Sequence, residues 1–248
     1  MRWFCVRLHK LEKIAVKVRS CTNCELCESR VKAVPGKGNF DADVIFVGEA
    51  PGRSEDISGE PFVGAAGKKL DMILEDAGIN RNDVYITNIV KCRPHNNRVP
   101  SKEEEMACND FINQEIEIIN PKIICVMGNT AYGTLLGGKE ITKNHGKIIE
   151  KDGKKFFVTF HPAATIYNQK LIDELKRDFK KLAGFLEDGN KIKQFEDRRC
   201  DFCMAKTKHE VVVMPKIVTR KRRWLFKCTE CKHERWLQPY RTVAESLY

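Results

Sequence analysis

The sequence has no apolar run long enough to cross a membrane. Its longest hydrophobic stretches, such as Val44–Val47 and Ile123–Met127, fall far short of the roughly 20 residues that a membrane helix needs. The first residues are basic and include no apolar segment before a small-residue cleavage site, so we expect no secretory signal and a cytoplasmic protein. The glycine fingerprint of dinucleotide-binding folds and the Walker phosphate loop are also absent, which excludes those two nucleotide-binding motifs.

Basic residues outnumber acidic ones in this 248-residue chain, and the formal net charge is +10. Most of the excess lies in residues 189–248, which hold 15 basic and 7 acidic residues, whereas residues 1–188 are close to balanced. An excess of positive charge points to a polyanionic partner but says nothing about fold. The length and the 42% hydrophobic content allow one sizeable domain and a small second one.

Short β-branched and aromatic runs predict four buried strands, at residues 43–48, 84–90, 122–128 and 156–160. Helical periodicity predicts helices between and after them, at residues 65–77, 101–119, 129–136 and 168–187. This alternation predicts a three-layer α/β/α sandwich around a mostly parallel four-stranded sheet. Ligands of such a sheet bind outside the carboxyl ends of its strands, so the loops there are the candidates for function.

Two local patterns add detail to these elements. Ser101 followed by Glu104 is a capping-box pairing that sets the start of the second helix, and Met106 is expected on the apolar face of that helix. Residues 147–160 contain two strand-like runs around Asp152-Gly153, a dipeptide that favours a type I′ hairpin turn. We therefore expect a hairpin to lead into the last core strand.

Polar residues follow three of the predicted strands. Glu49 and Glu55 lie in the long Gly-rich loop after the first strand, Asn88 ends the second, and His161 follows the last. Each has an ordinary alternative, because an acidic loop can be a solvated turn and a lone histidine is as often structural as catalytic. Together they predict a pocket able to bind a base-sized heterocycle.

Cysteine spacing gives a separate signal near the start of the chain. Cytosolic thiols are kept reduced, so the 11 cysteines are better explained as metal or cluster ligands than as disulfides. Cys21, Cys24 and Cys27 form a dense run like those that hold iron–sulfur clusters. Cys92 and Cys108 can supply the distant ligands that such a cluster needs.

The last quarter of the chain has the paired Cys-x2-Cys spacing of a zinc ribbon, in which four thiolates bind zinc. The four residues are Cys200, Cys203, Cys228 and Cys231. We expect a first domain at residues 1–188, a linker at 189–197 and a basic, zinc-ribbon-like β domain at 198–248. Basic residues beside Trp224 and Phe226 suit phosphate contact and base stacking, although a solvated basic hairpin is the alternative.

Six ordered blocks within residues 20–182 resemble the family 4 uracil-DNA glycosylases, the iron–sulfur type of thermophilic archaea and bacteria. The blocks are CTNCELCESR, VPGKGN, VGEAPGRSED, GEPFVGAAGKKLD, TNIVKCRPHNNRVPSKEE and TFHPAA. The resemblance implies a uracil-DNA glycosylase fold, a DNA substrate that contains uracil, and hydrolysis of the N-glycosidic bond to an abasic site. The zinc-ribbon-like segment lies outside it.

The resemblance also implies roles for individual residues. Phe62 would stack on uracil, Asn88 would read the O4 and N3–H edge, and His161 would donate a hydrogen bond to O2, where charge develops. Glu49 and Asn97 would orient the attacking water. The substrate would also contact a loop of four residues, Gly48, Ala50, Pro51 and Gly52.

The resemblance has further implications for how the site excludes thymine, how the base is flipped out of the DNA stack and which cysteines hold the cluster. Glu55 would brace Asn97 and crowd the C5 position of the base, which would exclude thymine. Ile166 stands where the family has a leucine-arginine pair and would be the apolar wedge, and Ala50 stands where some more distant relatives have an aspartate. A [4Fe-4S] cluster would be held by four ligands, Cys21, Cys24, Cys92 and Cys108. Cys27 would be a spare thiol.

Two alternatives stay open at the level of sequence. One is a related glycosylase for another base, such as hypoxanthine, xanthine or the thymine of a T·G mispair. The other is a non-catalytic iron–sulfur and zinc DNA-binding module. We expect a monomer that does not bind membranes, and no peptide for a sliding clamp or another repair protein is recognisable.

Overall fold

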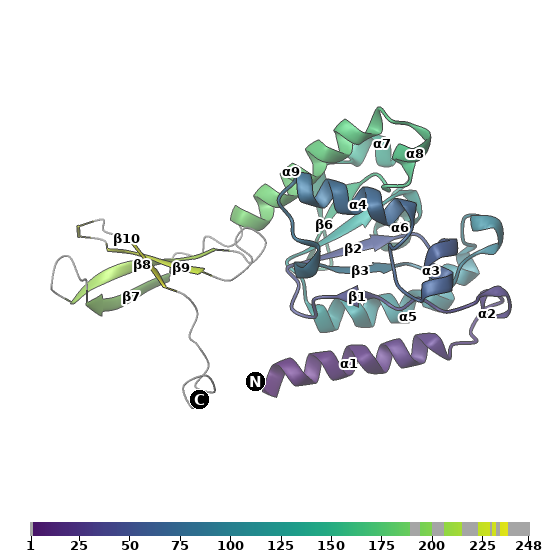
Figure 1. The fold of residues 1–248 in the computed structure, drawn as a ribbon, viewed down its shortest axis with the longest axis horizontal. Coiled ribbons are helices and arrows are strands. Elements are labelled where there is room, and N and C mark those ends of the chain that lie inside the picture. Colours follow the sequence, from purple (N-terminus) through teal and green to yellow (C-terminus); the bar gives the residue numbers. More distant parts are fainter. Residues whose placement is uncertain are drawn as a thin grey trace. The chain divides into compact units, whose positions relative to one another are not determined.

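The computed structural model describes residues 2–188, 194–199, 206–214, 223–228, 230–231 and 234–237. The chain divides into two compact units, Met1–Leu182 and Ala183–Tyr248 (Figure 1). No helix in the described part of the chain is long and apolar enough to span a membrane. The boundary at residue 188 between the two expected domains stays a prediction.

The first unit contains a six-stranded mixed sheet in the order β1-β3-β2-β4-β6-β5. Its strands are β1 (Lys37–Gly38), β2 (Val44–Gly48), β3 (Tyr85–Asn88), β4 (Ile123–Met127), β5 (Lys147–Lys151) and β6 (Lys154–Thr159). The four central strands are parallel, which confirms the predicted core. The sheet has six strands because β5, from the expected hairpin, and the two-residue β1 add antiparallel edges.

Helices cover both faces of this sheet. The α-helices in the described part of the chain are α1 (Arg2–Arg19), α2 (Leu26–Ser29), α3 (Arg53–Ser58), α4 (Ala65–Asp76), α5 (Lys102–Ile119), α6 (Asn129–Leu136), α7 (Ile141–Asn144), α8 (Ala164–Tyr167) and α9 (Leu171–Asp188). Short 3-10 helices are η1 (Arg81–Asp83) and η2 (His95–Asn97). The predicted helices correspond closely to α4, α5, α6 and α9, whereas α1 and α3 were not expected.

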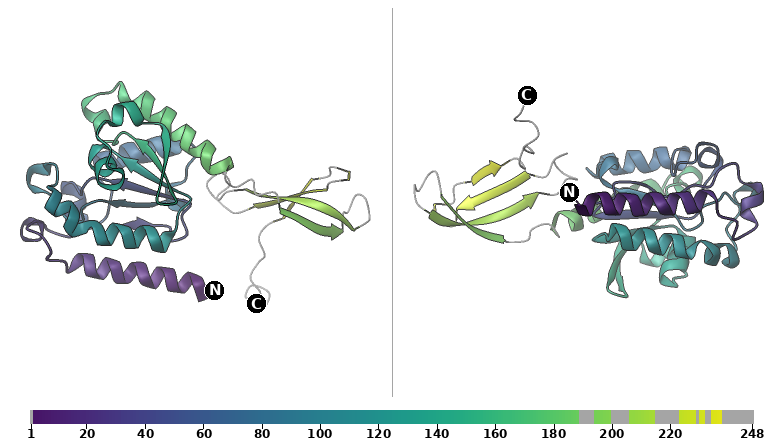
Figure 2. Two further views of the ribbon diagram at one scale, coloured as in Figure 1. Left: turned by 180° about the vertical axis from the view of Figure 1, so that it is seen from behind. Right: turned by 90° about the horizontal axis from the view of Figure 1, so that it is seen from below.

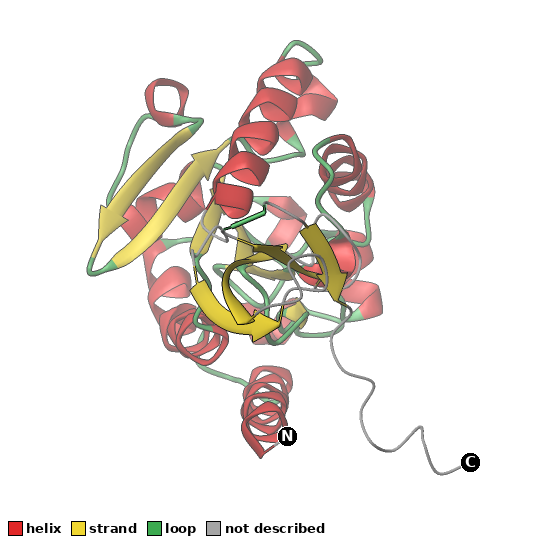
Figure 3. Ribbon diagram, turned by 90° about the vertical axis from the view of Figure 1, so that its left-hand side faces the viewer, coloured by secondary structure: helices red, strands yellow, loops and turns green. Residues whose placement is uncertain are grey.

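The layers are visible in the ribbon views. Helices α4 and α9 lie on one face of the sheet and α5 on the other (Figure 1), and α1 runs beside α5 as the outermost element (Figures 2 and 3). Phe46 of β2 stacks on Phe179 of α9, with ring centroids 5.5 Å apart. Leu11, Ile14 and Val18 of α1 are buried at helical spacing, which explains why this basic segment packs at all.

Local signals set the bounds of two elements as expected. The Ser101 side chain accepts a hydrogen bond from the Glu104 amide, and the Glu104 carboxylate accepts one from the Ser101 amide, so the predicted capping box is confirmed. Asp152 and Gly153 both have positive φ, as a type I′ turn requires. The expectation for Met106 was wrong, because its side chain is 68% exposed and points away from the buried face of α5.

The order of the strands creates the crevice where a site can form. Strand β3 lies on one side of β2 and β4 lies on the other, so the connections after β2 and β3 run in opposite directions. Loops that leave a parallel sheet in opposite directions separate from each other, and a crevice forms between them at the carboxyl ends of the strands. The polar residues predicted to converge all follow these ends.

The second unit contains a four-stranded antiparallel sheet in the order β10-β9-β8-β7. Its strands are β7 (Gln194–Arg199), β8 (Lys206–Met214), β9 (Arg223–Cys228) and β10 (Glu234–Leu237). Residues 194–197 were expected in a linker, but they pair with β8 and belong to β7. Of the expected zinc ligands, Cys228 is buried and Cys231 is partly exposed, whereas Cys200 and Cys203 lie outside the described residues.

A buried ion pair joins the sheet of the first unit to α5. The Lys91 ammonium lies 2.8 Å from the Glu115 carboxylate and also donates to the Thr87 hydroxyl at 2.6 Å and the Asn88 carbonyl at 3.0 Å. Glu115 accepts further hydrogen bonds from the Gly36 amide and the Thr87 hydroxyl. Both charged side chains are about 99% buried, so each depends on the other for its solvation.

The ion pair gives a stability prediction. Replacement Glu115→Gln leaves the Lys91 charge buried without its partner and should lower the free energy of unfolding by about 3–5 kcal/mol. Replacement Glu140→Gln breaks the exposed pair with Lys143 and should cost about 0–1 kcal/mol. Urea unfolding of the two variants measures the difference, and equal effects would contradict the importance of burial.

Candidate active site

A cavity of about 640 Å³ opens at the carboxyl ends of the parallel strands. It is lined by nine of the residues predicted from sequence: Glu49, Ala50, Pro51, Gly52, Glu55, Phe62, Asn88, Asn97 and His161. Gly48 is not among the lining residues but packs closely against two of them, since an added Cβ would lie 2.5 Å from Asn88 Oδ1 and 2.7 Å from Phe62 Cζ. Ile166 is not part of the lining and is exposed on α8, as a wedge must be.

Asn88 has a buried side-chain oxygen that lacks a protein partner. It is the last residue of β3 and is 2% exposed, yet Oδ1 forms no hydrogen bond in the structure. The backbone beneath it is fixed, because its carbonyl accepts from Lys91. A buried acceptor without a partner is costly, so this atom is suited to a ligand that brings a donor.

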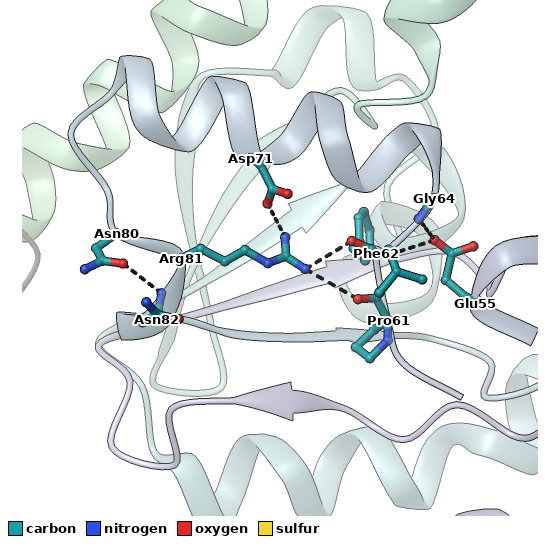
Figure 4. A network of polar contacts seen from close by, with 9 residues as sticks. Glu55, Pro61, Phe62, Gly64, Asp71, Asn80, Arg81 and Asn82 are labelled. Carbon is teal, nitrogen blue, oxygen red and sulfur yellow. Dashed lines mark hydrogen bonds and ion pairs between the residues drawn. The ribbon is translucent and has the colours of Figure 1, made fainter. Parts of the chain in front are cut away.

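Phe62 is held in a left-handed backbone conformation, with φ of 54°. Bulky residues rarely adopt it, and the strain is on the order of 1–3 kcal/mol. Glu55 accepts hydrogen bonds from the amides of Val63 and Gly64 at 3.0 and 2.7 Å, which fixes the chain after Phe62 (Figure 4). The strained loop thus presents a buried aromatic ring to the cavity.

The expected contact between Glu55 and Asn97 is absent, and that prediction was wrong. Both oxygens of Glu55 accept from backbone amides, since Oε2 binds Gly52 while Oε1 binds the two amides after Phe62. Asn97 is exposed, and its Oδ1 accepts from Arg93 Nε at 2.8 Å. Glu55 therefore shapes the loop on one side of the cavity, and Asn97 lies on another.

His161 presents a neutral imidazole. Its Nδ1 accepts from the amide of Ala163 at 3.1 Å, which leaves the proton on Nε2. Burial among protein atoms lowers the pKa of His161 from 6.5 to about 4. The ring centroid lies 5.6 Å from that of Phe62, so Nε2–H is a fixed donor beside the aromatic ring.

Glu49 follows β2 and lies against the loop after β4. Its carboxylate accepts a short hydrogen bond from the Thr130 hydroxyl at the start of α6. Sequence reasoning gave no role to Thr130, because the contact joins residues 81 positions apart and has no local pattern. The contact orients the Glu49 carboxylate at the wall of the cavity.

The cysteines expected to bind a cluster lie near one another. Burial is the main cause that raises the pKa of the Cys24 and Cys92 thiols, and it raises the pKa of Cys108 to about 11. The Cys21 and Cys24 thiols act on the pKa of Cys92, and the Cys92 and Cys24 thiols act on the pKa of Cys108, so these sulfurs share one neighbourhood, which also includes Cys27 through its effect on Cys24. Sulfur is the donor that iron–sulfur clusters need, and this group fits one.

Two details bear on this group of cysteines. No three His, Cys, Asp or Glu side chains among the described residues converge closely enough for a single ion, but each thiolate of a four-iron cluster binds a different iron and stands farther apart. Arg30 donates to Cys92 Sγ at 3.0 Å and to the Cys21 carbonyl at 2.7 Å. This arginine, whose role the sequence did not reveal, ties the two cysteine segments together.

The low pKa of His161 leads to a pH prediction. The folded pKa lies below the unfolded value of 6.5, so the contribution of neutral His161 to stability is complete above pH 6.5 and is lost as the pH falls toward 4. NMR titration of its ring protons, assigned with the His161→Gln variant, should give a midpoint near 4. A midpoint near 6.5 would contradict the enclosure of the ring.

Comparison with known proteins places the chain in a family. The sequence matches the family described as the uracil DNA glycosylase superfamily over residues 35–187. It is 44% identical over 184 residues to the type-4 uracil-DNA glycosylase of Archaeoglobus fulgidus, which covers 71% of this chain and 92% of that protein. The type-4 uracil-DNA glycosylase of Thermotoga maritima is 45% identical over 188 residues, with 75% and 94% covered.

The matched region contains the sheet of the first unit and every residue that lines the cavity. A third relative, the type-4 uracil-DNA glycosylase of Sulfurisphaera tokodaii, is 44% identical over 187 residues and covers 71% of this chain and 84% of its own length. The chain belongs to the uracil DNA glycosylase superfamily and is similar to its type-4 members.

Proposed function

We propose that the protein is a uracil-DNA glycosylase, which hydrolyses the bond between uracil and deoxyribose in DNA and leaves an abasic site for base excision repair. The observation that carries the proposal is the buried Oδ1 of Asn88, a residue that lines the cavity, because this atom has no hydrogen-bond partner. The N3–H group of uracil is the donor that this acceptor needs. A uracil within a duplex must first be flipped out of the base stack.

Asn88 and Phe62 recognise the flipped base. Phe62 stacks on the ring, Asn88 Oδ1 accepts from N3–H, and Asn88 Nδ2 donates to O4. In the observed orientation of the amide, cytosine would present its unprotonated N3 to Oδ1, and two acceptors repel each other. Glu55, whose carboxylate fixes the loop beside Phe62, supports the wall that faces the C5 position and excludes thymine.

His161 stabilises the charge that develops as the glycosidic bond breaks. The electron pair of the bond leaves with the base, and negative charge collects on uracil O2. The neutral imidazole donates from Nε2, because Nδ1 is occupied by the Ala163 amide. A fixed donor at the position of developing charge lowers the barrier, typically by a factor of about 10²–10³.

Water completes the reaction by adding to the sugar carbon and releasing a proton. Ala50 supplies no carboxylate, so Glu49 is the acidic group of the loop after β2 that orients this water, with Asn97 and loop carbonyls as further acceptors. Thr130 holds Glu49 against the wall of the cavity. Ile166, exposed on α8, fills the space that the flipped base leaves.

Two metal centres accompany this function in our proposal. A [4Fe-4S] cluster on Cys21, Cys24, Cys92 and Cys108 would brace the loop that carries Asn97, since Cys92 and Cys108 flank it. A Zn²⁺ ion on Cys200, Cys203, Cys228 and Cys231 would hold the second unit, whose basic residues add phosphate affinity. Uracil-containing DNA is the partner, and the protein acts as a cytoplasmic monomer.

An activity assay tests the function. Duplexes with one U·G, U·A or T·G pair are incubated with the protein, and abasic sites are cleaved with alkali. We expect cleavage at uracil only, reduced on the order of 10²-fold in Asn88→Asp, whose carboxylate repels O4. The matched variant Asn113→Asp, exposed on α5, should retain full activity.

Other outcomes of the same assay are informative. Cleavage at T·G or at a deaminated purine, with none at uracil, would replace the substrate but keep the mechanism. DNA binding without any cleavage by the folded protein would favour a non-catalytic binding module.

The cluster is tested by its composition. The purified protein should contain iron and acid-labile sulfide in equal amounts and absorb visible light. Cys108→Ser should lose most of the iron, because Cys108 is a proposed ligand, whereas Cys27→Ser should retain it. Equal losses in the two variants would show that Cys27 is a ligand as well.

A further inference from the structure

The backbone around Phe62 is also bound by a residue that does not line the first cavity. Arg81, the first residue of η1, donates from Nη2 to the Phe62 carbonyl at 3.1 Å and to the Pro61 carbonyl at 3.4 Å (Figure 4). Its Nη1 pairs with Asp71 of α4 at 2.6 Å. Arg81 belongs to none of the sequence blocks that resemble the family.

The backbone around Phe62 is therefore held by two opposite charges. Arg81 binds the carbonyls of Pro61 and Phe62, and Glu55 binds the amides of the next two residues. Gly67 of α4 completes the arrangement, because a Cβ there would lie 1.9 Å from the Phe62 carbonyl oxygen. A residue with φ of 54° persists only where its surroundings impose that conformation.

The position of the Phe62 ring depends on this backbone. The ring lies against Gly48 and 5.6 Å from the His161 ring, so a return of φ to its usual range would move it away from both residues. Arg81 and Phe62 both line a second cavity, and no hydrogen bond or ion pair among the described residues joins Arg81 to Asn88 or His161. Any effect of Arg81 on the base therefore passes through Phe62.

We propose that Arg81 is a positioning residue that sets the affinity of the pocket for uracil by holding Phe62 in its left-handed conformation, with Asp71 orienting the guanidinium. The inference rests on the proposed glycosylase function. This role requires a guanidinium group, because one of its nitrogens binds the Asp71 carboxylate while another binds the two backbone carbonyls. The competing role for a partly exposed arginine is a phosphate contact, which would act on DNA binding alone.

The test is a double-mutant cycle between Arg81 and Phe62. Rates of uracil excision and inhibition by free uracil are measured for the wild type, Arg81→Met, Phe62→Ala and the double variant. Arg81→Met should weaken inhibition by free uracil and lower kcat/KM, each by about 10-fold. In the Phe62→Ala background the same change should have no further effect.

Three further variants serve as controls. Lys68→Met removes an exposed positive charge beside the same second cavity and should leave uracil inhibition unchanged. Arg81→Lys should recover only part of the loss, and Asp71→Asn, which keeps the arginine, should show a smaller loss of the same kind. Melting temperatures are recorded for all variants, so that Asp71→Asn decides the question if Arg81→Met does not fold.

The outcomes separate the two proposals. Additive effects of Arg81→Met and Phe62→Ala, or unchanged inhibition by uracil with weaker DNA binding, would overturn the positioning role. Failure of the wild-type protein to excise uracil would instead overturn the proposed function.

Discussion

The buried ion pair between Lys91 and Glu115 is the constraint on which the site depends. Lys91 lies in the turn between Asn88, which ends β3, and Cys92, and its ammonium binds the carbonyl of Asn88 directly. Glu115 brings the opposite charge from α5, the helix that also carries Cys108. One interaction therefore fixes the backbone of Asn88, the residue proposed to read the base, and joins the two segments that carry Cys92 and Cys108.

Several polar side chains of the cavity have hydrogen-bond partners within the protein, and one buried polar atom does not. Glu55 binds three backbone amides, Glu49 binds Thr130, and the imidazole of His161 is occupied at Nδ1. Asn88 Oδ1 alone is buried without a partner among the groups of the described cavity. The polar groups around the pocket are thus held by protein partners, and the one buried acceptor left over is the atom that would meet the base, which is the arrangement expected for recognition by preorganised contacts.

Much of the fold could be predicted from local patterns. The parallel core follows from four β-branched runs, the start of α5 from Ser101 and Glu104, and the β5–β6 turn from Asp152-Gly153. The packing of α1 was missed because its sparse apolar stripe is surrounded by lysines and arginines. Met106 was misplaced because the buried face of α5 is set by the sheet and includes Glu115, which a hydrophobic pattern does not reveal.

The residues of the site could be predicted from the sequence, but the hydrogen bonds that they form could not. Residues that follow parallel strands must meet at one edge, so the convergence of Asn88, Glu49 and His161 was predictable. The partners of Glu55 were not, because a carboxylate that caps backbone amides has the same sequence signature as one that binds a side chain. Arg81 and Thr130 act through contacts between distant segments and carry no motif.

A crystal structure of the protein with uracil bound tests the central claim most directly. The account predicts that uracil stacks on Phe62, with N3–H donating to Asn88 Oδ1 and O2 accepting from His161 Nε2. Uracil bound outside the cavity, or bound within it while Asn88 Oδ1 still lacks a donor, would contradict the account.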